Sequence, residues 1–413
     1  MATTIEQLQT DQNTTIPLIV EQDKRLPLVT MQFTFTNSGT IAESKKAGLV
    51  KLSAKMMNEG TKTLGSSEFA SQLESRAIHI SSSVGVETFV MELSTLKEEL
   101  PFALSKLQEL LAQPNLTEQT LKKVKTMTLG SLSRKENDFD YTASNALKEL
   151  LFEGTPLSKP SLGTEDSVES ITLDDVKKFL QTHLVSSRLI VTVGGDVEID
   201  AVKKDVAKIV NLLQKGVSED VAFYEVRKES KEVVLKRETE QAYIYFGGPF
   251  ELKENDKDAY KAKVAAFVLG AGGFGSRLME EIRVKRGLAY SAYGRVNLSK
   301  SRSYFSGYLQ TKIDSLEEAK KSVKEVIAEF VKSGITQEEL DQTKRFLFGS
   351  EPLRVETMSQ RVQRSFMEYY KGVEQGASHK ELEKIEKLTL EEINSFIKHH
   401  TEIESLSFAI VTK

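Results

Sequence analysis

Two stretches of the sequence decide the fold, ITLDDVKKFLQTH at 171–183 and LTLEEINSFIKHH at 388–400. The second lies 217 residues after the first and keeps its order of Thr, Leu, two acids, Phe and His. Each begins with a Thr-Leu-acid-acid pattern, which is typical of a helix N-cap. Each runs on into an apolar strand, RLIVTVGG at 188–195 and LSFAIVTK at 406–413. The same helix–strand unit therefore occurs twice in the chain.

A second pair of stretches repeats in the same order. TEQTLKKVKTMTLGS at 117–131 matches TQEELDQTKRFLFGS at 336–350, at an offset of 219 residues. Two matches at nearly one offset indicate an internal duplication. The sequence therefore predicts two homologous domains, at 1–215 and 216–413, with the join in the charged stretch near 214–230.

Strands and helices are mixed within each half. LVTMQFTFT at 28–36 alternates apolar and polar residues, which predicts a half-buried antiparallel strand, and the stretch 233–248 resembles it. SLEEAKKSVKEVIAEFVKSG at 315–334 places its apolar residues on one helical stripe and ends at Gly334. These patterns predict an α+β fold, in which each domain holds an antiparallel-rich sheet covered on one face by helices.

The composition excludes several classes of function. The 413 residues carry 60 acids and 56 Lys and Arg, a net charge of −4, so there is no excess of positive charge to bind nucleic acid. Because the chain has no cysteine, disulfides, iron–sulfur clusters and thiol catalysis are ruled out. No apolar run approaches the ~20 residues of a membrane helix, and the N-terminus does not resemble a signal peptide. We therefore expect a cytoplasmic protein, with a periplasmic location as the alternative, and neither nucleic acid nor a membrane as partner.

A glycine-rich stretch, GAGGFGSR at 270–277, contains the pattern G-x-G-x-x-G. Its glycines are Gly270, Gly272, Gly273 and Gly275. A dinucleotide site needs a strand before this pattern and an acid about 20 residues after it. Here the preceding residues have helical character, and YSAYGRVNLSK at 290–300 has no acid, so we expect no nucleotide site. Two interpretations stay open: a turn between two helices, or a loop whose bare backbone approaches a ligand.

The next segment is SRLMEEIRVKRGLAYSAYG at 276–294. Early acids and late bases predict a helix that ends at Gly287. In the strand that follows, simple alternation places Tyr290 on the same face as Ala292. An arginine and a tyrosine that flank one helix–strand turn, here Arg283 and Tyr290, could bind a peptide carbonyl or carboxylate. The alternative is a basic helix end next to an ordinary strand tyrosine.

A third segment, AGLVKLSAKMMNEGT at 47–61, predicts a helix with one apolar stripe. Lys51 and Lys55 lie one turn apart on another face, with Ala54 beside them. None of these three side chains is suited to acid–base or metal chemistry.

The whole chain resembles the pitrilysin/insulinase family of zinc peptidases, which includes the mitochondrial processing peptidases. The match is closest in the glycine-rich turn and SRL of 272–278 and in RVKRGLAY at 283–290. The resemblance implies a duplicated, metallohydrolase-like α+β fold, with which the internal repeat agrees. It also implies that Arg283 and Tyr290 bind the substrate backbone near the scissile bond, and that the tyrosine helps to stabilise the tetrahedral intermediate. The corresponding positions of the first repeat are Glu74 and Ser81.

The resemblance breaks down at the zinc site. Catalytic members carry H-x-x-E-H in a frame similar to A-G-L-x-H-x-x-E-H-M-x-x-x-G-T, and the frame persists here at 47–61. The motif positions read Lys51, Ala54 and Lys55. Cations therefore replace both histidine ligands, and an ammonium cannot coordinate Zn²⁺. The third ligand, a glutamate on a later helix, is missing as well, since no acid occurs between Glu118 and Glu136.

These losses predict a chain that binds no zinc or other cofactor and does not cleave peptides alone. We expect a non-catalytic, substrate-binding subunit of a heteromeric zinc metalloendopeptidase that degrades or processes peptides. Its partner would be a homologous chain with an intact H-x-x-E-H, which holds the zinc. Arg283 and Tyr290 would complete the partner's site, and the glycine-rich loop would also contact the peptide. The alternative is a stand-alone homodimeric peptide-binding or scaffold protein of the same fold.

Overall fold

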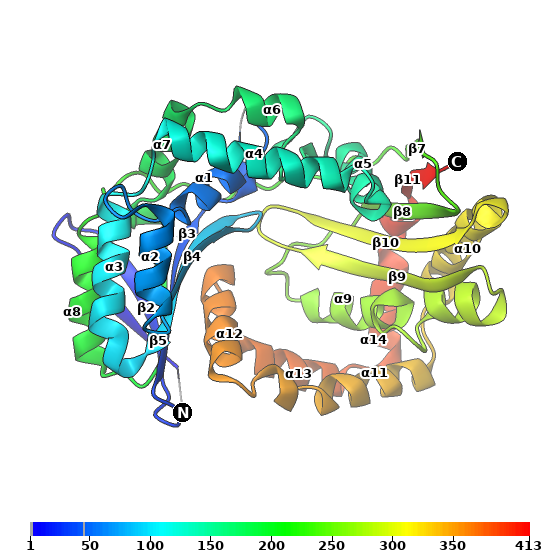
Figure 1. The fold of residues 1–413 in the computed structure, drawn as a ribbon. Coiled ribbons are helices and arrows are strands. Elements are labelled where there is room, and N and C mark those ends of the chain that lie inside the picture. The colour runs from blue at the N-terminus through cyan, green and yellow to red at the C-terminus, as the bar shows by residue number, and fades with distance from the viewer. Residues whose placement is uncertain (1–2, 44–45) are drawn as a thin grey trace. The chain divides into compact units, whose positions relative to one another are not determined.

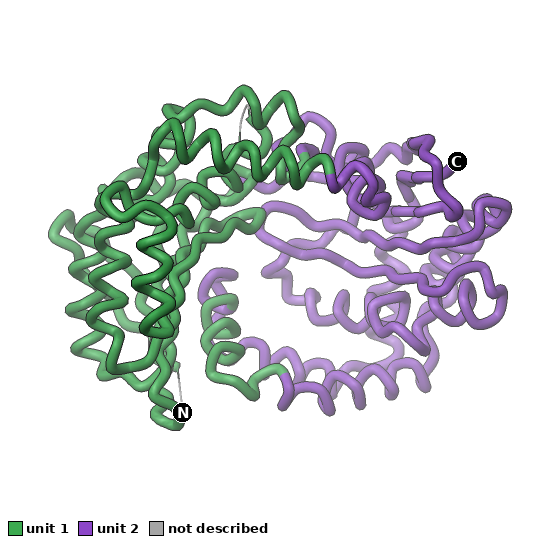
Figure 2. Tube along the Cα trace, in the orientation of Figure 1, with its two compact units in different colours: residues 1–133, 160–221, 354–367 green, residues 134–159, 222–353, 368–413 purple. Residues whose placement is uncertain are grey.

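The computed structural model describes residues 3–43 and 46–413. Contacts within the chain divide it into two compact units, which are coloured separately in Figure 2. Unit 1 consists of Met1–Ser133, Pro160–Val221 and Arg354–Met367, and unit 2 consists of Arg134–Lys159, Ala222–Leu353 and Glu368–Lys413.

Unit 1 is built around a six-stranded sheet with the order β1-β2-β6-β3-β5-β4 (Figure 1). Strands β2 and β6 pair in parallel, and all other neighbours pair antiparallel. The strands are β1 (Thr4–Gln9), β2 (Thr15–Gln22), β3 (Leu28–Thr36), β4 (His79–Val84), β5 (Thr88–Leu96) and β6 (Leu189–Gly195).

Unit 2 holds a five-stranded sheet with the order β7-β11-β8-β10-β9. Its one parallel pair is β7 with β11. The strands are β7 (Glu232–Lys236), β8 (Gln241–Pro249), β9 (Ala289–Leu298), β10 (Ser303–Lys312) and β11 (Ser407–Thr412). This order repeats that of the first sheet without β1, and the parallel pair lies at the same place. The duplication and the α+β fold are therefore confirmed.

The two helices of the repeated motif begin as predicted. The hydroxyl of Thr172 accepts a hydrogen bond from the N–H of Asp175, and that of Thr389 accepts one from the N–H of Glu392, both at 3.2 Å. The α-helices are α1 (Leu49–Met57), α2 (Gly65–Glu74), α3 (Leu100–Ala112), α4 (Glu118–Lys135), α5 (Phe139–Phe152), α6 (Glu165–Ser170), α7 (Leu173–His183), α8 (Ile199–Val210), α9 (Ala259–Ala266), α10 (Leu316–Ser333), α11 (Gln337–Gly349), α12 (Met358–Lys371), α13 (Ala377–Lys387) and α14 (Leu390–His399). Within the described part of the chain, none of the helices has the length and apolarity needed to cross a membrane. The cytoplasmic location stays a prediction.

Two helices pack on the sheet formed by the other half of the sequence. Helix α5, from the first half, packs on β8 and β11 of unit 2, and the start of α12, from the second half, belongs to unit 1. A glycine makes room for each helix. If Gly247 carried a Cβ atom, that atom would lie 3.2 Å from Leu151 of α5. A Cβ atom at Gly194 would lie 3.1 Å from Met358 of α12. The prediction divided the chain into two unbroken halves, whereas each unit of the structure includes a segment from the other half. The helix in each exchanged segment covers part of the second face of the sheet.

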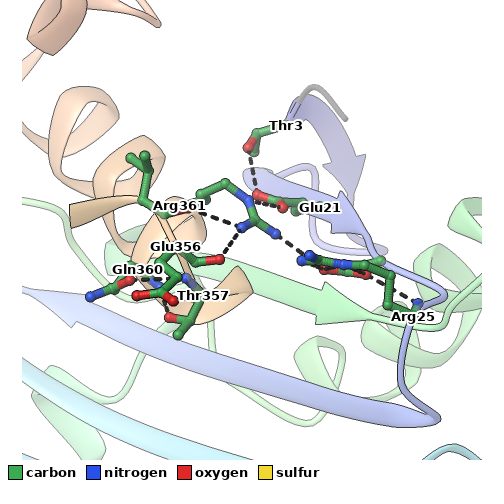
Figure 3. Close-up of polar contacts among 9 residues, drawn as sticks. Thr3, Glu21, Arg25, Glu356, Thr357, Gln360 and Arg361 are labelled. Carbon is green, nitrogen blue, oxygen red and sulfur yellow. Dashed lines mark hydrogen bonds and ion pairs between the residues drawn. The ribbon is translucent and has the colours of Figure 1, made fainter. Parts of the chain in front are cut away.

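Arg361 fastens the start of α12 to the sheet of unit 1 (Figure 3). Its Nε donates to Glu21 Oε1 at 2.6 Å, and its Nη2 donates to Asp23 Oδ2 at 3.1 Å. Both carboxylates are buried. Hydrogen bonds from Arg25 hold the pKa of the Asp23 carboxyl well below its usual range, so it stays charged. A buried charge is tolerated only with such partners.

Arg361→Ala is expected to lower the free energy of unfolding by ~3–5 kcal/mol, because it leaves the buried Glu21 carboxylate without its guanidinium. Denaturant unfolding followed by circular dichroism measures the change. Gln363→Ala, at an exposed position of the same helix, is the control and should change stability by less than ~0.5 kcal/mol. Equal stability of Arg361→Ala and the wild type would show that this ion pair does not anchor α12.

Candidate functional site

Helix α1 carries the three positions of the lost zinc motif. Its start is capped by Glu43, whose carboxylate accepts the N–H of Val50 at 2.9 Å. Lys51 and Lys55 are half-buried, and Ala54 is buried. Burial lowers the pKa of Lys51, which the charge of Glu43 opposes. Burial, together with the charge of Lys51, also lowers the pKa of Lys55.

Helix α4 lies where the resemblance requires a third zinc ligand. The Nζ of Lys55 donates to the Oγ1 of Thr128 on this helix at 2.9 Å, so the group of α4 that meets this motif position is a hydroxyl and not a carboxylate. Across residues 3–43 and 46–413, no three His, Cys, Asp or Glu side chains lie together as a metal site requires. Ammonium and hydroxyl groups are poor partners for Zn²⁺, so these residues do not fit zinc. That the chain binds no zinc in solution stays a prediction.

The two corresponding positions of the first repeat hold neither an arginine nor a tyrosine. Glu74 ends α2, and Ser81 lies in the edge strand β4. The amide of Asn58 accepts the N–H of Ser82 at 2.6 Å and donates to its C=O at 2.9 Å. A strand added to the edge of β4 would need these same two backbone groups. Asn58 therefore occupies the middle of this edge.

The glycine-rich loop connects two π-helical segments, Phe267–Ala271 and Met279–Lys285. The helix α9 precedes it, as the helical character of these residues predicted, whereas a dinucleotide site needs a strand there. An added Cβ at Gly270 would lie 2.4 Å from the backbone nitrogen of Gly294, so this residue lets the helix approach β9.

The other three glycines of the loop have different roles. A Cβ at Gly272 would lie 2.8 Å from the carbonyl oxygen of Phe267. Gly273 and Gly275 have φ values of 67° and 88° and open space beside them, so they shape the turn. The structure favours the interpretation as a turn, and contact of the loop with a peptide stays a prediction.

Arg283 lies on the second π-helical segment, where an α-helix was predicted. The N–H of Arg286 donates to the C=O of Glu281 at 3.2 Å, five residues back, and Gly287 then ends the segment with a φ of 63°. π-Helical turns are rare in proteins, and those that occur are frequently found at functional sites.

Ion pairs fasten both ends of this segment to neighbouring helices. Arg277 donates two hydrogen bonds of 2.8 Å to Glu339 at the start of α11. Arg286 bonds Glu281 and reaches Glu325 of α10 at 3.0 Å. In the described residues, by contrast, Arg283 has no carboxylate within ion-pair distance. Arg283 is thus the arginine of this segment that is left for a ligand.

Tyr290 projects from an irregular point of β9. The register between β9 and β10 runs from Ala292 with Leu309 to Ala289 with Thr311, so two residues of β9 face one residue of β10. This β-bulge changes the direction of the side chain. Tyr290 is 82% exposed, whereas Ala292 is 0% exposed. The predicted alternation, which placed the two on one face, is therefore wrong at this point.

Arg283 lies close to two exposed aromatic rings. Its Cζ is 4.4 Å from the ring centroid of Tyr290 and 4.6 Å from that of Phe274. The structure thus brings together the two residues named from the sequence. It adds Phe274, which the sequence analysis did not single out. The available signal was a large apolar residue between two glycines, in a loop where polar residues are usual.

The chain is similar to known proteins over most of its length. Residues 22–165 match the family model described as insulinase (peptidase family M16), and residues 170–347 match the model described as peptidase M16 inactive domain. The non-peptidase homolog YmxG of Helicobacter pylori is 44% identical over 397 residues, which cover 96% of this chain and 92% of that protein.

Two solved structures share the fold. The peptidase M16 inactive domain from Pseudomonas fluorescens has a TM-score of 0.89 at 22% identity, covering 99% of this chain and 97% of that one. A protease from Helicobacter pylori has a TM-score of 0.86 at 17% identity and is covered over 100% of both chains.

Proposed function

Because the chain belongs to the insulinase family of peptidases (family M16), we propose that it is the non-catalytic, substrate-binding subunit of a heteromeric zinc metalloendopeptidase. Its partner is a homologous chain that keeps H-x-x-E-H. The relative named a non-peptidase homolog supports the non-catalytic part of this proposal. The heteromeric assembly and the peptide substrate rest on the chemistry of the residues described above.

One contrast carries the proposal. The positions that would hold zinc and the general base are Lys51, Ala54 and Lys55, which can do neither task. Arg283 and Tyr290, however, are retained. The tyrosine is exposed and the arginine is partly exposed, and among the described residues the arginine has no carboxylate partner. A chain that served only as a scaffold would not need a partly exposed arginine held against an exposed tyrosine.

The residues of this chain would bind the peptide and stabilise charge. Zinc, held by the partner, supplies the activation of the attacking water. Arg283 donates N–H groups to a backbone carbonyl oxygen of the substrate and so fixes its position. The hydroxyl of Tyr290 donates a hydrogen bond to the oxygen that becomes negative in the tetrahedral intermediate.

The peptide would be held as an added strand on the partner's sheet rather than on this chain. Addition to a sheet edge uses the free N–H and C=O groups of the edge strand. On β4 of this chain, the two outward groups of Ser82 are already bonded to Asn58. This capped edge supports a division of tasks between the two chains.

A titration tests the proposal. A fixed amount of the H-x-x-E-H homologue from the same organism is mixed with increasing amounts of this chain, and cleavage of a fluorogenic peptide is followed. We expect neither chain alone to cleave and activity to rise until the two are equimolar, with a heterodimer in light scattering. A homodimer of this chain that leaves the homologue's activity unchanged would favour the alternative, a stand-alone peptide-binding protein.

A further inference from the structure

Phe274 is an apolar side chain in an unusual position. It lies between Gly273 and Gly275, whose positive φ values turn the loop so that the ring is 71% exposed. Its ring contacts the guanidinium of Arg283. Exposed apolar residues that gather at one point mark binding sites more often than scattered ones do. Here the exposed rings of Phe274 and Tyr290 both lie close to the guanidinium of Arg283.

Two aromatic rings that lie close to one guanidinium restrict how it can turn. Aromatic faces attract the flat face of a guanidinium, while its N–H groups point outward in its plane. An arginine side chain without such contacts would lose its rotamer freedom only when the ligand binds, which weakens binding. Tyr290 alone offers one ring, and Phe274 supplies the second at a similar distance, 4.6 Å against 4.4 Å.

We propose that Phe274 is a positioning residue, which holds Arg283 as a preformed fork for a backbone carbonyl oxygen of an extended peptide. The identity of this ligand rests on the proposed function. The orientation of Arg283, in contrast, is a property of this chain alone. Phe274 acts through Arg283, by means of the face of its ring rather than by its apolar volume.

Three substitutions of Phe274 separate the effect of its aromatic face from the effect of its apolar volume. Phe274→Tyr keeps an aromatic face, and the exposure of the site leaves room for the added hydroxyl. Phe274→Leu keeps an apolar side chain but removes the aromatic face. Phe274→Ala removes both. Because the side chain is exposed, all three variants should fold, which thermal unfolding checks.

The first experiment uses this chain without a partner. The Nε–H signal of Arg283 in a ¹⁵N-labelled sample is assigned by its loss in Arg283→Lys. In the wild type and Phe274→Tyr, we expect a ring-shifted signal from an ordered side chain. In Phe274→Leu and Phe274→Ala, the signal should move toward that of a mobile arginine. A signal that keeps its position in Phe274→Leu would overturn the proposal.

The second experiment uses the mixture of this chain and its zinc-holding homologue. Since the arginine binds the substrate in the ground state and in the transition state, Phe274→Leu should raise KM about two- to fivefold with little change in kcat. Phe274→Tyr should restore KM, and failure to do so would contradict the role of the ring. If the signal of Arg283 behaves as expected but no mixture cleaves peptides, the proposed function fails while the positioning by Phe274 stands.

Discussion

Tyr290→Phe is expected to lower kcat of the reconstituted pair by about 10²–10³-fold, because it removes one hydrogen-bond donor to the oxyanion. The substitution keeps the ring, so the contact with Arg283 at 4.4 Å is retained. KM should therefore change little. Since the side chain is 82% exposed, the folded chain loses no buried hydrogen bond. The loss would fall on the chemical step alone.

Tyr293→Phe is the matched control for this prediction. It removes a hydroxyl from the same strand, on a side chain that is 38% exposed and whose ring stacks on Tyr308 at 5.6 Å. Steady-state kinetics of both variants, at saturating amounts of this chain, give the comparison. We expect Tyr293→Phe to keep the rate of the wild type. Equal rates for Tyr290→Phe and Tyr293→Phe would remove Tyr290 from the mechanism.

Introducing three ligands should create a zinc site in unit 1. We expect the triple variant Lys51→His, Lys55→His, Thr128→Glu to bind one Zn²⁺ per chain at micromolar zinc, whereas the wild type binds none. The reason is that Lys55 and Thr128 already meet at 2.9 Å across α1 and α4. Two imidazoles and one carboxylate, with a water as fourth ligand, form a usual zinc site. The change also removes two like charges that repel the ion.

Equilibrium dialysis followed by elemental analysis measures this gain. The double variant Lys51→His, Lys55→His is the control, and it should bind zinc far more weakly because it offers only two ligands. Circular dichroism shows whether the buried carboxylate at position 128 is tolerated without metal. Stoichiometric zinc in the wild type would contradict the interpretation of this site, and so would a folded triple variant that binds no zinc.

The general plan of the fold could be predicted from the sequence. The repeats at 171–183 and 388–400 indicated two similar units, because a duplicated pattern of caps and apolar residues folds in the same way twice. The exchange of α5 and the start of α12 could not be predicted. An amphipathic stripe shows that a helix packs on something, but not on which sheet. That choice depends on Gly194 and Gly247, which accept the helices at close distance.

The candidate site was predictable only in part. Arg283 and Tyr290 were named because RVKRGLAY matches a family pattern, while their residue types alone left an ordinary helix end and strand as the alternative. The β-bulge that exposes Tyr290 arises from pairing with β10 and has no local signal. The role of Phe274 depends on a turn that only the positive φ values of its neighbours create. The first is a tertiary effect and the second a local backbone conformation, and alternation along one strand reveals neither.

The most direct test of the account is the single-turnover rate of the pair that carries Arg283→Ala together with Tyr290→Phe. Light scattering first establishes that this double variant still forms the complex with the zinc-holding chain. The proposed function predicts that the assembled complex then cleaves peptide no faster than the zinc-holding chain alone. A rate equal to that of the wild-type pair would contradict it, because this chain would then contribute neither the binding of the peptide backbone nor the stabilisation of the oxyanion.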